Sequence, residues 1–75
     1  MRRYGNLSGD SGVRAYESGD GEIVLRFVDG WHYRYTDASA GAEHIATMQR
    51  LARAGRGLST YVSQVVREGY AERWR

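Results

Sequence analysis

The sequence predicts an α+β fold in which a three-stranded antiparallel β-meander is covered on one face by two C-terminal helices (β-β-β-α-α). Two observations indicate this class. The first half of the chain alternates apolar and polar residues between glycine-rich turns, and the second half places apolar residues at helical spacing. The chain has 75 residues, of which 41% are hydrophobic and 27% are charged. This composition is typical of a globular protein, and the length is enough for one small core.

Three stretches have the pattern of strands. Residues 13–16 alternate apolar and polar side chains, residues 22–27 are rich in β-branched and aromatic residues, and residues 31–35 alternate aromatic with basic residues. Turn-forming residues at 18–21 separate the first two strands. Before them, residues 1–11 are expected to form a flexible or loosely ordered arm, which includes most of a loop rich in glycine and serine at 7–12.

The turn between the second and third strands decides which side chains share a face. A two-residue turn would place the apolar side chains of one strand beside the basic side chains of the other. A three-residue turn at 28–30, with Gly30 in the left-handed conformation, instead pairs Leu25 with Tyr33 and Ile23 with Tyr35. We predict this turn because it produces one wholly apolar or aromatic face. The other face then carries Val24, Arg26, His32 and Arg34.

The first helix can be capped by Asp37 or Ser39 and runs to about Ala54, where the glycines of residues 55–57 end it. Its apolar stripe consists of His44, Ile45, Met48, Leu51 and Ala52. We expect this stripe to cover the apolar face of the sheet.

The second helix can be capped by Ser59 or Thr60 and is expected to end near Gly69. Its apolar stripe consists of Tyr61, Val62, Val65 and Val66. The chain then turns back onto the body of the protein and ends in a basic aromatic tail at residues 72–75.

Four short motifs in the sequence resemble those of a known family. They are Val13-Arg14-Ala15-Tyr16-Glu17, Phe27-x-x-Gly30-x-x-Tyr33-x-Tyr35, Gly55-Arg56-Gly57 and Tyr61-Val62-Ser63-x-x-Val66-Arg67-x-x-Tyr70. Over roughly residues 12–71 the chain resembles the KTSC domain, named for its occurrence at the C-terminus of some lysyl-tRNA synthetases. The family usually has Ser-Lys-Gly at the third motif and Tyr-Phe-Asn at the start of the fourth. The resemblance implies a small α+β domain without established catalysis, and the synthetase fusion suggests a nucleic-acid role.

The charge is basic and unevenly distributed. All eleven basic side chains are arginine, and the net charge is +2. Residues 1–49 hold five arginines and seven acids, whereas residues 50–75 hold six arginines and two acids. Arginine presents a planar fork that suits phosphate and carboxylate, so an acidic partner is indicated. The excess is smaller than that of a dedicated nucleic-acid binder.

The first candidate site binds phosphates and has two parts, the turn between the helices and the open face of the sheet. Tyr16 would lie beside Arg14 there and offer a ring for base stacking. The alternatives are a solvated face, on which arginines pair with Glu22 or Thr36, and an ordinary glycine C-cap followed by a Ser/Thr N-cap. The predicted nucleic-acid-binding residues are Arg14, Arg26, His32, Arg34, Arg56, Ser59 and Thr60.

The second candidate site is the C-terminal tail, because Tyr, Trp and Arg dominate the energetics of protein interfaces. The predicted partner-binding residues are Tyr70, Arg73, Trp74 and Arg75. A phage or mobile-element protein that docks on a host complex would fit this class, and so would a homodimer paired through an edge strand. The alternative is a frayed end with Trp74 lying on the edge of the core.

No catalytic constellation is found. His44 falls in an apolar stripe and is expected in the core, and neither it nor His32 has a carboxylate at metal-ligand spacing. There is no cysteine, and no serine lies in a glycine elbow. An enzyme, a metal and a cofactor are therefore not expected. Without a signal-like start or an apolar run of about 20 residues, a cytoplasmic protein is expected that does not bind membranes. The sequence predicts a small non-catalytic module that binds RNA or DNA phosphates, or alternatively a protein-interaction module.

Overall fold

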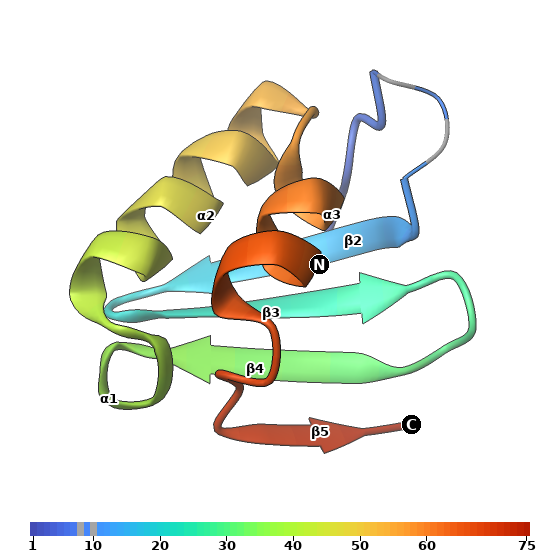
Figure 1. The fold of residues 1–75 in the computed structure, drawn as a ribbon. Coiled ribbons are helices and arrows are strands. Elements are labelled where there is room, and N and C mark those ends of the chain that lie inside the picture. Colours follow the sequence, from blue (N-terminus) through green and yellow to red (C-terminus); the bar gives the residue numbers. More distant parts are fainter. Residues whose placement is uncertain (8, 10) are drawn as a thin grey trace.

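The sheet has five antiparallel strands in the order β1-β2-β3-β4-β5. Figure 1 labels β2 to β5, and the helices come between β4 and β5 in the chain. The structure is a computed structural model, and it describes residues 1–7, 9 and 11–75. The strands are β1 (Arg2–Arg3), β2 (Val13–Gly19), β3 (Glu22–Phe27), β4 (His32–Thr36) and β5 (Glu72–Trp74). The helices are α1 (Asp37–Ala40), α2 (Ala42–Ala54), α3 (Leu58–Tyr61) and the π-helix η1 (Val62–Val66). The predicted α+β class is confirmed, but the predicted number of strands, three, is wrong.

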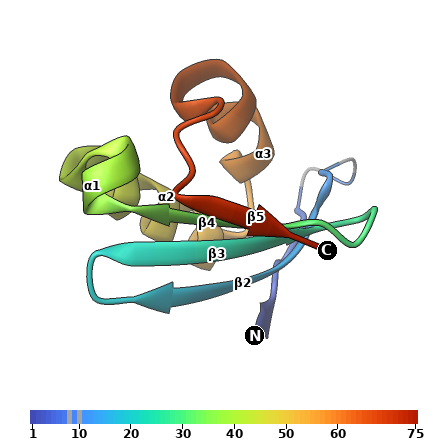
Figure 2. The same ribbon diagram turned by 90° about the horizontal axis from the view of Figure 1, so that it is seen from below.

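The helices lie on one side of the sheet, and the described residues leave the other side open (Figure 2). The core forms between the two layers. Side chains from β2, β3 and β4 pack there against α2, α3 and η1, and Leu58, which the sequence analysis did not single out, is fully buried. The buried cluster consists of Tyr4, Val13, Tyr16, Ile23, Leu25, Tyr35, Ile45, Met48, Ala52, Leu58, Val62 and Val66.

The hairpin of β3 and β4 has the predicted three-residue turn. The amide of Phe27 donates to the carbonyl of Trp31 at 2.9 Å, and Gly30 has φ of 91°. Leu25 pairs with Tyr33, and Ile23 pairs with Tyr35, as expected. The apolar face is thus turned toward the helices, and the face with Arg26, His32 and Arg34 is the open one.

Strand β2 departs from simple alternation. Its register against β3 shifts between Val13 and Ala15, so Arg14 occupies a β-bulge. A bulge adds one residue to one strand and reverses the alternation beyond it. Tyr16 therefore pairs with Leu25 on the helix-facing side and is only 6% exposed. The prediction that Tyr16 lies beside Arg14 on the open face is wrong for this reason.

The N-terminal segment is more ordered than the predicted arm over residues 2–4. Arg2 and Arg3 form β1 along the edge of β2, and Tyr4 is 3% exposed. The Tyr4 hydroxyl accepts a hydrogen bond from the amide of Leu58 at 3.2 Å. A buried aromatic ring thus holds this end of the chain to the helices. The predicted loop at 7–12 includes positions 8 and 10, which lie outside the described residues.

The C-terminal tail is also part of the sheet. Residues of β5 pair with β4, and the amide of Ala71 donates to the carbonyl of Arg34 at 2.7 Å. The expected return of the chain onto the body is confirmed. The frayed end that we considered as an alternative is wrong, because β4 offers an unpaired edge that the tail fills.

The predicted first helix is two helices. Thr36 caps α1, accepting from the amide of Ser39 at 3.1 Å while its own amide donates to the Ser39 hydroxyl at 2.9 Å. Gly41, with φ of 102°, then separates α1 from α2. Helix α2 ends at Ala54 as predicted, with Gly55 in the left-handed conformation.

The second helical segment begins at Leu58, two or three residues earlier than a cap at Ser59 or Thr60 predicts. Gly57 precedes α3, and no side chain caps it, so the predicted cap at Ser59 or Thr60 is wrong. Both residues lie within α3, whose first residue, Leu58, is fully buried. Val65 was expected to be buried but is 46% exposed, since the buried positions recur every four residues at 58, 62 and 66.

Candidate functional site

The open face of the sheet carries a row of side chains that crosses all five strands. Cross-strand pairing places its members side by side, and neighbours in such a row are about 5 Å apart. We call it the basic row, and it consists of Arg3, Ala15, Arg26, His32 and Trp74. The bulge adds Arg14 beside it.

Three arginines from three strands meet at one end of the basic row. Arg3, Arg14 and Arg26 line a hollow of about 240 Å³ whose floor includes Ala15, and they also line an adjoining hollow of about 350 Å³. All three side chains are exposed, and none of them forms an ion pair with another described residue. The positive charge in this hollow is therefore not neutralised within the described part of the chain. An uncompensated group of arginines attracts anions.

Two rings stand at the other end of the basic row. His32 and Trp74 are stacked, with ring centroids 5.3 Å apart and planes inclined by 8°. Trp74 is 40% exposed, whereas the Nδ1 atom of His32 is buried without a hydrogen-bond partner among the described residues. The exposed indole is an aromatic surface on which a base could stack.

Arg34 belongs to a second row that carries the opposite charge. We call this the acidic row, and it consists of Glu17, Val24, Arg34 and Glu72. The Nε atom of Arg34 lies 2.6 Å from Glu72, and its Nη1 atom lies 2.9 Å from Glu22. Hydrogen bonds from Arg34 to Glu22 and Glu72 raise its pKa. The charge of Arg34 is already paired, so the alternative pairing with Glu22 considered above is confirmed.

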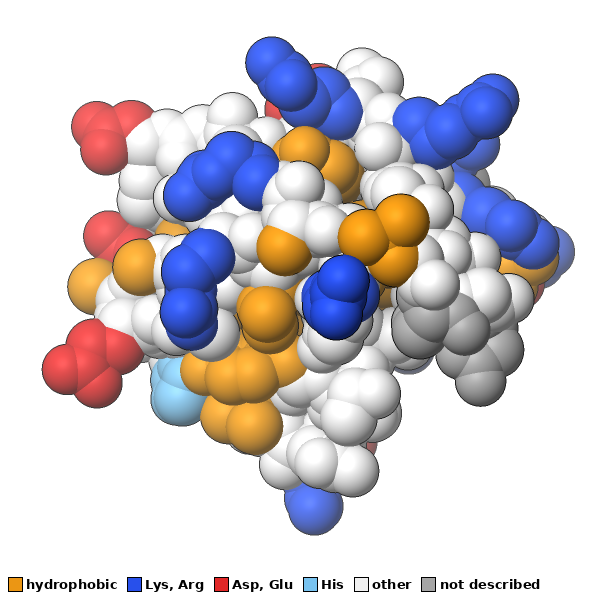
Figure 3. All heavy atoms as spheres, turned by 90° about the horizontal axis from the view of Figure 1, so that it is seen from above, with side chains coloured by type: hydrophobic (Ala, Val, Ile, Leu, Met, Phe, Trp, Pro, Cys, Tyr) orange, Lys and Arg blue, Asp and Glu red, His pale blue; other side chains and the backbone are white. Residues whose placement is uncertain are grey.

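The inter-helix turn does not join this surface. Arg56 lies between α2 and α3, and Ser59 and Thr60 lie within α3, all in the helical layer on the other side of the sheet. The basic side chains on that side are spread out, with hydrophobic side chains between them (Figure 3). The amide of Leu58, at the start of α3, already donates to the Tyr4 hydroxyl. The two predicted parts therefore lie on opposite sides of the sheet and do not form one surface.

The predicted tail site is divided between the two faces. Trp74 points to the open face, whereas Arg73 pairs with Tyr33 on the helix-facing side and lies 5.3 Å from the ring of Trp31. Tyr70 packs edge-to-face on Tyr33, with centroids 5.1 Å apart. Arg75 donates to the carbonyl of Asp29 at 3.3 Å. Tyr70, Arg73 and Arg75 thus contact other residues at the end of the sheet, and of the four predicted residues only Trp74 belongs to the basic row.

Sequence reasoning missed Arg3. Its strand has two residues, too few for a period to be visible in the sequence. His44, predicted in the core, is half-buried, and its Nδ1 atom lies 2.6 Å from the Tyr61 hydroxyl. Among the described residues no cluster of three potential metal ligands occurs.

Comparison with known proteins returns no match: no family model, no curated protein and no solved structure is similar to the chain. The resemblance to the KTSC domain stays a prediction from sequence motifs. In the part of the chain that the structure describes, every helix is too short or too polar to span a membrane.

Proposed function

We propose that the protein is a small non-catalytic module that binds the phosphate backbone of single-stranded RNA or DNA across the open face of its sheet. The observation that supports this most is the hollow lined by Arg3, Arg14 and Arg26, whose arginines have no acidic partner among the described residues. Arginine forks suit phosphate oxygens, and such contacts position a strand without reading its sequence.

The rest of the basic row favours a single strand over a duplex. Trp74 and the arginine hollow lie at opposite ends of one row that spans roughly 19 Å, four inter-strand spacings of about 4.8 Å. Base stacking on an exposed ring requires bases that are not already paired. A strand laid along the row would meet phosphate-binding groups and then a stacking surface.

The affinity is expected to be weak and sensitive to salt. Three phosphate contacts on a single strand predict a slope of about −2 in a plot of log affinity against log salt concentration. Fluorescence-anisotropy titrations of short single-stranded RNA, single-stranded DNA and duplex DNA at several salt concentrations measure this slope. Single strands should bind more tightly than the duplex.

Matched variants test the surface. Arg26→Ala should weaken binding and reduce the slope by about 0.7, whereas Arg56→Ala, which removes the same charge from the helical layer, should not. Equal losses in the two variants would show that only net charge matters. Unchanged binding in Arg26→Ala would overturn the proposal.

A protein-interaction module is the second candidate, and the exposed Trp74 on the terminal strand favours it. An apolar partner surface that covers this indole would bind with little dependence on salt. Trp74→Ala would then abolish binding, while Arg26→Ala would leave it unchanged. A homodimer paired through a sheet edge could form few backbone hydrogen bonds, because the edge strands β1 and β5 have only two and three residues.

A further inference from the structure

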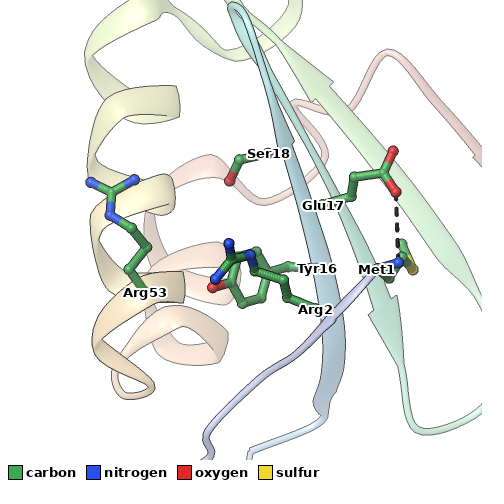
Figure 4. A pocket seen from close by; sticks show the side chains of 6 residues that line it. All are labelled: Met1, Arg2, Tyr16, Glu17, Ser18 and Arg53. Carbon is green, nitrogen blue, oxygen red and sulfur yellow. Dashed lines mark ion pairs between the residues drawn. The ribbon is translucent and has the colours of Figure 1, made fainter.

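A second group of arginines lies on the helix-facing side of the sheet, at the edge formed by β1. A cavity of about 540 Å³ opens there, lined by Met1, Arg2, Tyr16, Glu17, Ser18 and Arg53. The helices do not cover this edge completely, so the cavity is open to solvent (Figure 4). Its volume lies within the usual range for small-molecule sites, roughly 300–1,000 Å³.

Four side chains that can donate hydrogen bonds line the cavity, and they come from three elements. Arg2 pairs with Tyr16 across β1 and β2, so both side chains point to the same side, and Figure 4 shows Arg2 reaching over Tyr16 toward α2. Arg53 rises from α2 on the facing wall, and Ser18 follows two residues after Tyr16 on the same face of β2. None of these four side chains has a hydrogen-bond or ion-pair partner within the described residues.

The acid at the rim does not neutralise the two arginines. Glu17 pairs with Val24 and therefore points to the open face, where its carboxylate lies 3.8 Å from the Met1 amino group. Two guanidinium groups thus face one cavity with two hydroxyls beside them and no carboxylate of the described residues between them. Bringing two like charges together is unfavourable unless an anion compensates them.

We propose that this cavity binds a phosphomonoester group. At neutral pH a phosphomonoester carries close to two negative charges, which matches the two arginines, whereas a phosphodiester carries one. Arg2 and Arg53 would each present a fork to the phosphate oxygens, and the hydroxyls of Tyr16 and Ser18 would donate the remaining hydrogen bonds. The group could belong to a free mononucleotide or to the terminal phosphate of a strand.

This site is distinct from the basic row. Arg2 and Arg3 are successive residues of one strand and point to opposite faces, so β1 lies between the cavity and the arginine hollow, and Met1 is the one described residue that lines both. The proposal therefore does not rest on the nucleic-acid proposal. A small phosphomonoester can bind the cavity whether or not a strand binds the open face.

The test uses methyl phosphate and dimethyl phosphate as probes. Each probe is titrated into the intact chain, and binding is followed by the amide signals in NMR spectra. Methyl phosphate should bind saturably, shift the amide signals of β1, β2 and the C-terminal half of α2, and bind at least about tenfold more tightly than dimethyl phosphate. Arg53→Ala should weaken methyl phosphate binding about tenfold or more, and Arg53→Lys should recover only part of it, since the charge returns without the fork.

Two controls make the test specific. Arg50→Ala removes the same charge from an exposed position of the same helix that does not line the cavity, and it should leave binding unchanged. Arg26→Ala should also leave it unchanged while weakening single-strand binding, so the two proposals can fail separately. Equal affinities for the two probes, or equal losses in Arg50→Ala and Arg53→Ala, would overturn the proposal.

Further arms distinguish the two sources of the phosphate. Adenosine 5′-monophosphate is compared with adenosine, and a 5′-phosphorylated oligothymidine is compared with the same strand carrying a 5′-hydroxyl. Preference for the mononucleotide over the nucleoside supports a small-molecule site. Preference for the phosphorylated strand, lost in Arg53→Ala, supports a site for strand ends.

Discussion

At the scale of single residues, backbone strain is found at Arg67, directly after η1. Its φ of 48° and ψ of −113° lie in a region that glycine adopts freely and other residues avoid. Arg67→Gly should therefore stabilise the fold by about 1 kcal/mol, after allowance for the greater freedom of glycine in the unfolded chain. For a domain of this size that is a rise in Tm of several degrees, measured by thermal melting. Arg67→Ala keeps the strain and should show no such rise; a rise in both variants would show that the side chain matters instead.

Tyr35 is the residue through which alkaline pH should act on the fold. It is 1% exposed, and burial raises the pKa of its hydroxyl well above the usual value, with Tyr33 and Tyr70 raising it further. The folded state thus holds the proton more tightly than the unfolded chain does. The contribution of Tyr35 to the free energy of unfolding is then constant below about pH 10, the unfolded pKa, and falls as the pH rises above it. Urea titrations at increasing pH should show this fall, and Tyr35→Phe should make it shallower. An identical fall in the variant would contradict the assignment.

At the scale of elements, a strand could be predicted where a pattern extends over several residues. The alternation through β3 and β4, together with the glycine at position 30, was enough to predict both the turn and the pairing of Leu25 with Tyr33. Strands β1 and β5 are too short to show a period and exist because β2 and β4 offer open edges. For the same reason Arg14 and Arg26 could be predicted for the site, but Arg3 could not. The ion pair of Arg34 with Glu72 depends on β5, so it could not be predicted from the sequence either.

The integration of β5 makes removal of the tail a test of the fold rather than of a partner site. Deleting residues 72–75 exposes the edge of β4, unstacks His32 and leaves Arg34 with Glu22 alone. We expect a clear loss of thermal stability and new chemical shifts along β4. Arg75→Ala, which keeps the strand, is the control and should melt close to the wild type. A deleted chain that melts as the intact one does would show that the tail is not a strand in solution.

At the scale of the whole molecule, the open face separates its charges into rows. The basic row has unpaired arginines and an exposed indole, and in the acidic row next to it Glu72 holds Arg34 by an ion pair. The net charge is only +2, but the hollow carries a local excess of positive charge because three arginines and no acid line it. The same separation suggests that the acidic row limits how many phosphates the face can contact.

Glu72→Gln tests that limit. The change releases one of the two ion pairs of Arg34, leaves the β5 backbone in place and lets the guanidinium turn toward a bound strand. Single-strand affinity should rise a few-fold, and the salt slope should steepen by about 0.7, the value of one additional phosphate contact. Glu43→Gln makes the same change of net charge on α2, on the far side of the sheet, and is the matched control. If both variants bind equally well, long-range charge alone governs affinity. If Glu72→Gln alone gains, the ion pair on the open face restrains an arginine that can otherwise reach the strand, and the two rows act as one binding surface.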